Sequence, residues 1–193
     1  AATWEHQALT RARAVAGDTR LAAEVQDAIE AVLHRPRPQA ALAQDVRAMR
    51  MRIFKEHGSD DPWNLKHVRG GIVEIEFLAQ YLQLAHLAEH PGLRDRSTPA
   101  VFAKAALAGL LPDHDAAALD HAWRLLIRLF ATLRLSQDSG TMPRSIPAAM
   151  QEALLRVADP QGRSGLPSDM ALLQRRLVES QEAVRQVFDR PLS

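Results

Sequence analysis

The spacing of apolar residues predicts a chain that is helical almost throughout. Apolar residues recur at intervals of three and four, alanine and leucine dominate, and runs of β-branched residues are short, a pattern typical of helices with one buried face. Glycine and proline residues interrupt the pattern along the chain, and both residue types favour helix ends. We therefore expect an all-α fold, a helical bundle of seven or eight helices.

The predicted helices lie between these interruptions, and several begin at residues suited to capping. They cover approximately residues 3–16, 19–34, 39–57, 72–89, 98–107, 113–133, 148–157 and 169–188. Gly17 is suited to end the first helix and Asp18 to cap the second. Thr98 is expected to cap the fifth helix, and Ser168 or Asp169 to open the last. The apolar stripe predicted for the second helix comprises Leu21, Val25, Ala28, Ile29 and Val32.

The longest irregular stretch runs over residues 58–71. It opens with Gly58-Ser59-Asp60-Asp61 and ends with Gly70-Gly71, and residues of these types favour loops. We interpret residues 1–193 as a single helical domain, with a possible subdivision near residues 58–71.

Composition excludes several classes of protein. The 193 residues include no cysteine, which excludes disulfide scaffolds and thiolate metal sites. The net charge is +1, whereas binding to duplex nucleic acid favours a clear basic excess. No apolar run approaches the roughly 20 residues that span a bilayer, so we expect a cytoplasmic protein that binds neither nucleic acid nor membrane. Because the chain starts at Ala1 without a methionine, we expect a piece of a longer protein.

Two short motifs suggest metal binding but have simpler interpretations. Residues His86 to His90 match an H-x-x-E-H pattern, yet Pro91 disfavours the helical geometry that His90 would need. Asp113-His114-Asp115 follows a proline at a predicted helix start, where acidic residues cap backbone N–H groups. We expect no metal site in either segment.

The segment from Lys66 to Phe77 is the strongest candidate for a functional site. Lys66 and Arg69 precede Gly70-Gly71, and two glycines allow close backbone approach or positive φ. The double glycine stands at a predicted helix start, where outward-facing N–H groups attract anions. These features allow a site for an anion such as a phosphate.

Three polar side chains follow on this predicted helix. Glu74 and Glu76 are two positions apart and must face roughly opposite sides, whereas Glu76 and Gln80 share a face that Gln83 extends. On the structural hypothesis, Glu74 compensates the helix dipole and Glu76 pairs with a core arginine. We expect Glu76 to be the buried, partnered carboxylate and Glu74→Gln to be better tolerated than Glu76→Gln.

Two motifs give the chain a resemblance to a known family. Thr3-Trp4-Glu5-His6-Gln7, followed by Arg11-Ala12-Arg13, resembles the helix that follows the nucleotidyltransferase core in glutamine synthetase adenylyltransferases. The segment 65–84, with Arg69-Gly70-Gly71 at its start, resembles that family's helical-domain motif, with Glu74 where aspartate is typical. The resemblance covers essentially the whole chain and identifies it as similar to the C-terminal helical domain.

The resemblance implies a bifunctional nucleotidyltransferase that attaches AMP from ATP to a glutamine synthetase tyrosine and removes it again. ATP and Mg²⁺ would serve the parent enzyme, and glutamine synthetase and the PII signal protein would be its partners. The family's catalytic signature, a glycine-serine turn followed by a D-x-D strand, is missing from this chain. We therefore expect no catalytic residue here and no adenylyltransferase activity from the isolated chain. We also expect the isolated chain to be a monomer without a bound cofactor.

The resemblance implies that this chain closes one side of the nucleotide cleft of the parent enzyme. Lys66 and Arg69 are the candidates to meet phosphate or the substrate protein, and Glu76 is the candidate to orient one of them. The residues expected to support the cleft are Lys66, Arg69, Gly70, Gly71, Glu74, Glu76, Gln80, Arg11 and Arg13. A cluster of Lys66, Arg69 and Glu76 beside the first helix would favour this role, with Lys66, Arg69, Arg11 or Arg13 as the partner of Glu76.

Two alternatives stay open. The chain could be an interaction module that docks glutamine synthetase or PII, with the double glycine purely structural. It could also be the related helical domain of a PII uridylyltransferase.

Overall fold

The computed structural model describes residues 3–136, 146–158 and 169–190, and every regular element in these ranges is a helix. The predicted all-α bundle is therefore confirmed. The elements are α1 (Thr3–Leu9), α2 (Thr19–Leu33), α3 (Gln39–His57), α4 (Ile72–His86), the 3-10 turn η1 (Pro91–Leu93), α5 (Thr98–Leu107), α6 (Asp113–Ser136), α7 (Ala148–Ala158) and α8 (Met170–Asp189).

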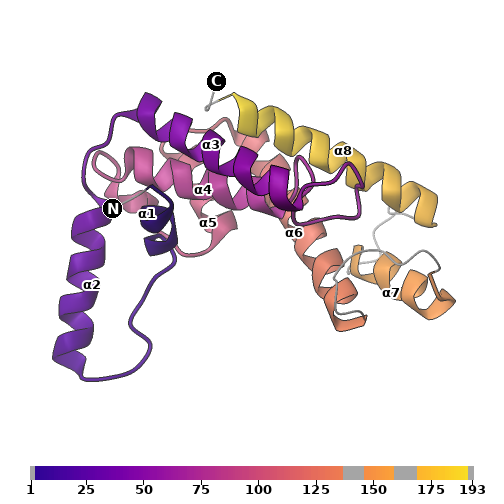
Figure 1. Ribbon diagram of the computed structural model, residues 1–193, viewed down its shortest axis with the longest axis horizontal. Coiled ribbons are helices and arrows are strands. Elements are labelled where there is room, and N and C mark those ends of the chain that lie inside the picture. The colour runs from indigo at the N-terminus through magenta and orange to yellow at the C-terminus, as the bar shows by residue number, and fades with distance from the viewer. Residues whose placement is uncertain (1–2, 137–145, 159–168, 191–193) are drawn as a thin grey trace.

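Helix α4 forms the centre of the fold and contacts α1, α3, α5, α6 and α8. Its sequence is apolar on several faces, and Ile75, Leu78 and Leu82 are almost completely buried, as expected of a helix surrounded by others. Figure 1 shows α3 and α4 running alongside each other, with α2 projecting from one end of the molecule.

Helix α6 organises the other half of the core, where it contacts α5, α7 and α8. Leu119, Leu126 and Leu133 recur every seven residues along one face and are fully buried, together with Phe102 of α5 and Leu177 of α8. Although α6 has 24 residues, neither it nor any other described helix is apolar enough to cross a membrane.

The first helix is shorter than predicted, because α1 ends at Leu9 rather than near residue 16. Two long-range contacts hold the following residues in another conformation. Arg94 donates a hydrogen bond to the carbonyl of Thr10, and the Arg11 guanidinium pairs with Glu76. Tertiary contacts have therefore overridden the helical propensity of residues 10–16.

Most predicted helix starts are confirmed. Asp18 caps α2 by accepting a hydrogen bond from the Leu21 amide, and Asp169 caps α8 in the same way, while Ser168 lies outside the described residues. The cap of α5 is one residue earlier than predicted, at Ser97.

The apolar stripe predicted for α2 is only partly buried. Ile29 and Leu33, near the C-terminal end of α2, belong to the core, but Leu21 is 58% exposed and Val25 is 43% exposed. The exposed half of α2 is the part that projects from the body of the molecule in Figure 1.

The turn before α4 fits closely against α8. Gly70 has φ +77°, a left-handed conformation that favours glycine. A Cβ atom at Gly70 would lie 1.9 Å from the carbonyl oxygen of Gln181 in α8. Gly70 therefore allows the turn and α8 to approach each other.

We predict that Gly70→Ala destabilises the chain much more than Gly109→Ala. Gly109 also has positive φ, at +71°, but its added Cβ would meet no atom within 4 Å. Gly109→Ala should therefore cost about 1–2 kcal/mol for the left-handed backbone alone, whereas Gly70→Ala adds about 1–3 kcal/mol or more for overpacking. Thermal melts followed by circular dichroism measure the difference, and equal losses of Tm would contradict this account of the turn.

Candidate functional site

The backbone around the double glycine is already hydrogen-bonded within the chain. The Ile72 amide donates to the Leu65 carbonyl at 2.9 Å, and the Val73 amide donates to the Lys66 carbonyl at 3.2 Å. These are N–H groups of the first turn of α4, which would otherwise be available to a ligand. These N–H groups of the helix start are therefore not available to an anion, because carbonyls of the preceding loop accept their hydrogen bonds.

Glu74 lies in the first turn of α4 with its side chain fully buried. One carboxylate oxygen accepts hydrogen bonds from Arg50 Nε at 3.0 Å and Arg69 Nε at 2.6 Å. The other accepts the Gly70 amide at 2.7 Å, as the acidic residue of a capping box bonds a preceding amide. Glu74 therefore joins α3, the Gly70 turn and α4.

The two arginines extend this network in opposite directions. Arg50, whose side chain is 2% exposed, also donates to the carbonyls of His67 and Val68 at 3.1 and 3.2 Å. Arg69 reaches the other way and pairs with Asp189 near the end of α8 at 3.0 Å. We call Arg50, Glu74, Arg69 and Asp189 the Glu74 network; it connects α3, α4 and α8.

Burial governs the electrostatics of Arg50. Loss of solvent lowers the pKa of Arg50, Glu74 opposes this by favouring the charged form, and Arg69 adds to the lowering. The guanidinium also lies over the Phe54 ring, 5.2 Å from its centroid, within cation–π range. Its Nη1 is buried without a hydrogen-bond partner among the described residues.

Glu76 lies on the other side of α4 and belongs to a different set of contacts. It pairs with Arg11 at 2.8 Å, and Arg11 also donates to the Thr98 hydroxyl at 3.1 Å. The side chain of Glu76 is 24% exposed and that of Arg11 is 44% exposed. The partner is one of those predicted, but the expectation that Glu76 is the buried carboxylate is wrong, because Glu74 takes that position.

The rest of the predicted polar strip on α4 also serves packing. Gln80 accepts a hydrogen bond from Gln7 of α1 at 3.0 Å, and Gln83 accepts the Asp95 amide at 3.1 Å. Together with the Arg11 pair, these bonds attach α1 and the loop before α5 to the central helix. The strip is therefore occupied by contacts within the chain.

The structure divides the predicted site residues between these two sides of α4. Glu74 and Glu76 face different partners, as their spacing predicted, so the cluster of Lys66, Arg69 and Glu76 that would have favoured the cleft-closing role does not form. Lys66 and Arg13 are exposed and make no ion pair with any described residue.

Sequence reasoning missed Arg50 and Asp189. Arg50 follows Leu42 and Val46 at four-residue spacing, and all three are buried on the same side of α3. An arginine that continues an apolar stripe is a signal of a buried, partnered charge. Asp189 is 120 residues from Arg69 in sequence, and nothing in the local pattern connects them.

The remaining motifs have structural roles in the described residues. His90 has φ −126° and ψ 73°, outside helical geometry as Pro91 predicted. Asp115 is buried and pairs with Arg190, the residue that follows α8, at 2.7 Å. Asp61 accepts the Trp63 amide at 2.9 Å in a local turn. Within the ranges that the structure describes, no three histidine, aspartate or glutamate side chains lie together in a way that could hold a metal ion.

The fold and the site define an all-α domain in which buried ion pairs attach a double-glycine turn to a central helix. The chain belongs to the family whose model is described as GlnD PII-uridylyltransferase, which matches residues 40–191.

Three relatives that match nearly the whole chain are each a bifunctional glutamine synthetase adenylyltransferase/adenylyl-removing enzyme. The relative from Xanthobacter autotrophicus is 43% identical over 98% of this chain. Relatives from Bradyrhizobium sp. BTAi1 and Rhodopseudomonas palustris TIE-1 are 43% and 41% identical over 96% and 97% of it. The chain spans 18% of the length of each. The resemblance to glutamine synthetase adenylyltransferases is therefore confirmed.

We predict that Glu74→Gln lowers stability more than Glu76→Gln. Removing the Glu74 charge leaves the buried Arg50 uncompensated, at a cost of about 3–5 kcal/mol, or roughly 6–20 °C in Tm for a chain of this size. The partly exposed pair of Glu76 should contribute about 0–1 kcal/mol. Thermal melts of the two variants compare the costs directly, and an equal or larger loss for Glu76→Gln would refute the ranking.

We also predict that stability falls as the pH is lowered through the histidine range. Burial, followed by the charge of Lys66, lowers the pKa of His67 below its ordinary value of 6.5. The unfolded chain therefore takes up a proton at this position at a higher pH than the folded chain, so stability present above pH 6.5 is lost below it.

The variant His67→Gln should lose less Tm between pH 7.5 and 5.5 than the unchanged chain. A residual slope should remain, because the pKa values of His6 and His86 are also lowered, mainly by burial. His121→Gln, at an exposed position of α6, is the matched control. If both variants keep the full slope, His67 does not contribute to it.

Proposed function

We propose that this chain is the C-terminal helical domain of a bifunctional glutamine synthetase adenylyltransferase/adenylyl-removing enzyme. The observation that carries the proposal is the 43% identity to the Xanthobacter autotrophicus enzyme over 98% of the chain. The whole enzyme would transfer AMP from ATP to a tyrosine of glutamine synthetase and remove it again, and so regulate nitrogen assimilation. It would act in the cytoplasm, with glutamine synthetase and PII as its partners.

In this proposal the chain closes one side of a nucleotide cleft, and a nucleotidyltransferase domain elsewhere in the enzyme binds ATP and Mg²⁺. Adenylyl transfer depends on positioning the reactants and neutralising phosphate charge. Because Arg69 already forms ion pairs with Glu74 and Asp189, Lys66 and Arg13 are the better candidates to reach phosphate or the substrate protein.

The other predicted site residues would then act as positioning residues. Arg69, Gly70, Gly71 and Glu74 hold the loop that carries Lys66, since the Lys66 carbonyl accepts an amide of α4. On the other side, Gln80 and its neighbours attach α1 to α4. No residue of this chain is proposed to contact the reacting atoms.

A second candidate function is a module that docks glutamine synthetase or PII. The exposure of Leu21 and Val25, four positions apart on the projecting helix α2, favours this alternative, because contiguous exposed apolar surface often binds partners. The helical domain of a PII uridylyltransferase is a third possibility, supported by the description of the family model.

An exchange experiment tests the proposal. This chain replaces the matching segment of the Xanthobacter autotrophicus enzyme, and adenylylation of glutamine synthetase is measured with labelled ATP. We predict a rate within about tenfold of the parent enzyme, or roughly 1.4 kcal/mol in the barrier. In this enzyme Lys66→Ala should lower kcat/KM by about tenfold, whereas Lys55→Ala, at an exposed position of α3, should not.

The controls separate the three candidates. The isolated chain should transfer no label. An exchanged enzyme that folds but modifies PII rather than glutamine synthetase would favour the uridylyltransferase alternative. A rise in the KM for glutamine synthetase with Leu21→Ser, without any effect of Lys66→Ala, would favour the docking module. An exchanged enzyme that folds and modifies neither protein would refute the proposal.

A further inference from the structure

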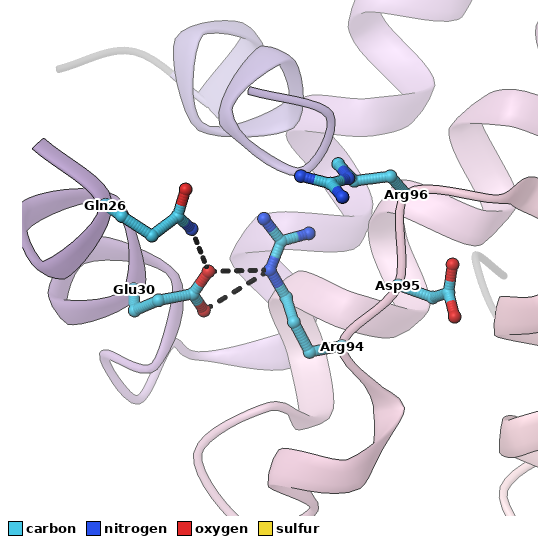
Figure 2. Close-up of a pocket in the computed structure, with 5 residues that line it drawn as sticks. All are labelled: Gln26, Glu30, Arg94, Asp95 and Arg96. Atoms are coloured by element: carbon cyan, nitrogen blue, oxygen red, sulfur yellow. Dashed lines mark hydrogen bonds and ion pairs between the residues drawn. The ribbon is translucent and has the colours of Figure 1, made fainter. Parts of the chain in front are cut away.

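A second cluster of arginines lies away from the double glycine, where α2 meets the loop before α5. A pocket of about 230 Å³ opens there, lined by Gln26, Glu30, Arg94, Asp95 and Arg96. Figure 2 shows the guanidinium groups of Arg94 and Arg96 on the same side of this pocket. Two cations so placed repel each other unless each has a counter-ion.

Arg94 has such a counter-ion within the chain. Its Nε lies 3.1 and 3.3 Å from the two carboxylate oxygens of Glu30, and the guanidinium also donates to the Thr10 carbonyl. The Glu30 carboxylate accepts the Gln26 amide at 2.7 Å and lies 3.7 Å from His34 Nδ1. The Arg94 side chain is only 16% exposed and is held through Nε and Nη1, while the residue lines the pocket.

Arg96 has no counter-ion in the part of the chain that the structure describes. Its side chain is exposed and makes no ion pair or side-chain hydrogen bond with any described residue. The adjacent Asp95 does not compensate it, because that carboxylate pairs with Lys104 at 3.0 Å and accepts the Ser97 amide at 2.8 Å. Figure 2 shows the Asp95 carboxylate on the opposite side from the two guanidinium groups.

We infer that this pocket binds a phosphate oxyanion, held by the guanidinium of Arg96 and by Nη2 of Arg94, which makes no hydrogen bond with a described residue. A guanidinium presents paired N–H donors that match phosphate oxygens. The anion would also supply the negative counter-charge that Arg96 lacks among the described residues. Arg94 is held in place by Glu30 and Thr10, so its donors are arranged before the anion arrives.

The size of the pocket limits the ligand. About 230 Å³ is smaller than the roughly 300–1,000 Å³ of pockets that enclose whole small molecules. It suits one or two phosphate groups, either as free phosphate or pyrophosphate, or as the phosphate chain of a nucleotide whose base remains outside. The inference needs only the residues of this chain, and it stands or falls separately from the proposed function.

Calorimetric titration of the chain with sodium pyrophosphate, at constant ionic strength, tests the inference. Arg96→Ala should weaken binding about tenfold to a hundredfold, the range expected for a lost hydrogen bond to a charged group, and Arg96→Lys should restore part of it. Arg47→Ala is the matched control, because Arg47 is an exposed arginine of α3 that makes no ion pair with a described residue. Both alanine variants should melt like the unchanged chain.

The same titration with inorganic phosphate and with ATP distinguishes the sources of the anion. Equal affinity for phosphate and pyrophosphate supports a site for a free phosphate, and tighter binding of ATP supports the phosphate chain of a nucleotide. Equal weakening by Arg96→Ala and Arg47→Ala would mean diffuse attraction to the surface and would overturn the inference. Failure of all three probes to bind at millimolar concentration would also overturn it.

Discussion

The fold depends on one fully buried carboxylate. Glu74 receives hydrogen bonds from Arg50, Arg69 and the Gly70 amide, and so fixes the start of the central helix relative to α3 and the preceding turn. Whole buried ion pairs often contribute little net stability compared with apolar replacements, whereas breaking one is costly. We therefore interpret the Glu74 network as a device that selects one arrangement of α3, α4 and α8 rather than as a source of stability.

The network also explains the double glycine. With the Gly70 amide held against Glu74, the backbone at Gly70 has positive φ and packs directly on the Gln181 carbonyl of α8. Gly71 is confined as well, because an added Cβ would lie 2.8 Å from the carbonyls of Leu65 and Val68. The two glycines that looked most like a phosphate loop in the sequence are thus required by packing, and their amides donate hydrogen bonds within the chain, Gly70 to Glu74 and Gly71 to the Val68 carbonyl.

Sequence reasoning predicted the helices well and the site only in part. Periodicity and capping residues such as Asp18 depend on neighbours within one or two turns, so the sequence contains that information. The spacing of Glu74 and Glu76 likewise predicted that they face different sides. Which carboxylate is buried depends on Arg50 of another helix and on Asp189 at the far end of the chain. The early end of α1 has the same origin, since Arg94 and Glu76 hold residues 10 and 11.

Arg69, Gly70 and Glu74 of the double-glycine motif bond to one another within the chain. A ligand is therefore more readily bound by side chains that have no partner in the fold. In the described residues Lys66, Arg13 and Arg96 are exposed cations with no ion pair, and Arg96 is the one that lines a pocket beside a second guanidinium. Arg94 and Arg11 attach residues 10–11 to the loop before α5, so the segment that leads to Arg13 and the loop that carries Arg96 are fixed to each other. A ligand held at this junction would contact α2 and both of these segments. Arg13, one of the two candidates to reach phosphate in the proposed function, is therefore held near the loop that carries Arg96, whereas Lys66 lies on the loop of the double-glycine turn, where Glu74 connects α3, α4 and the Gly70 amide.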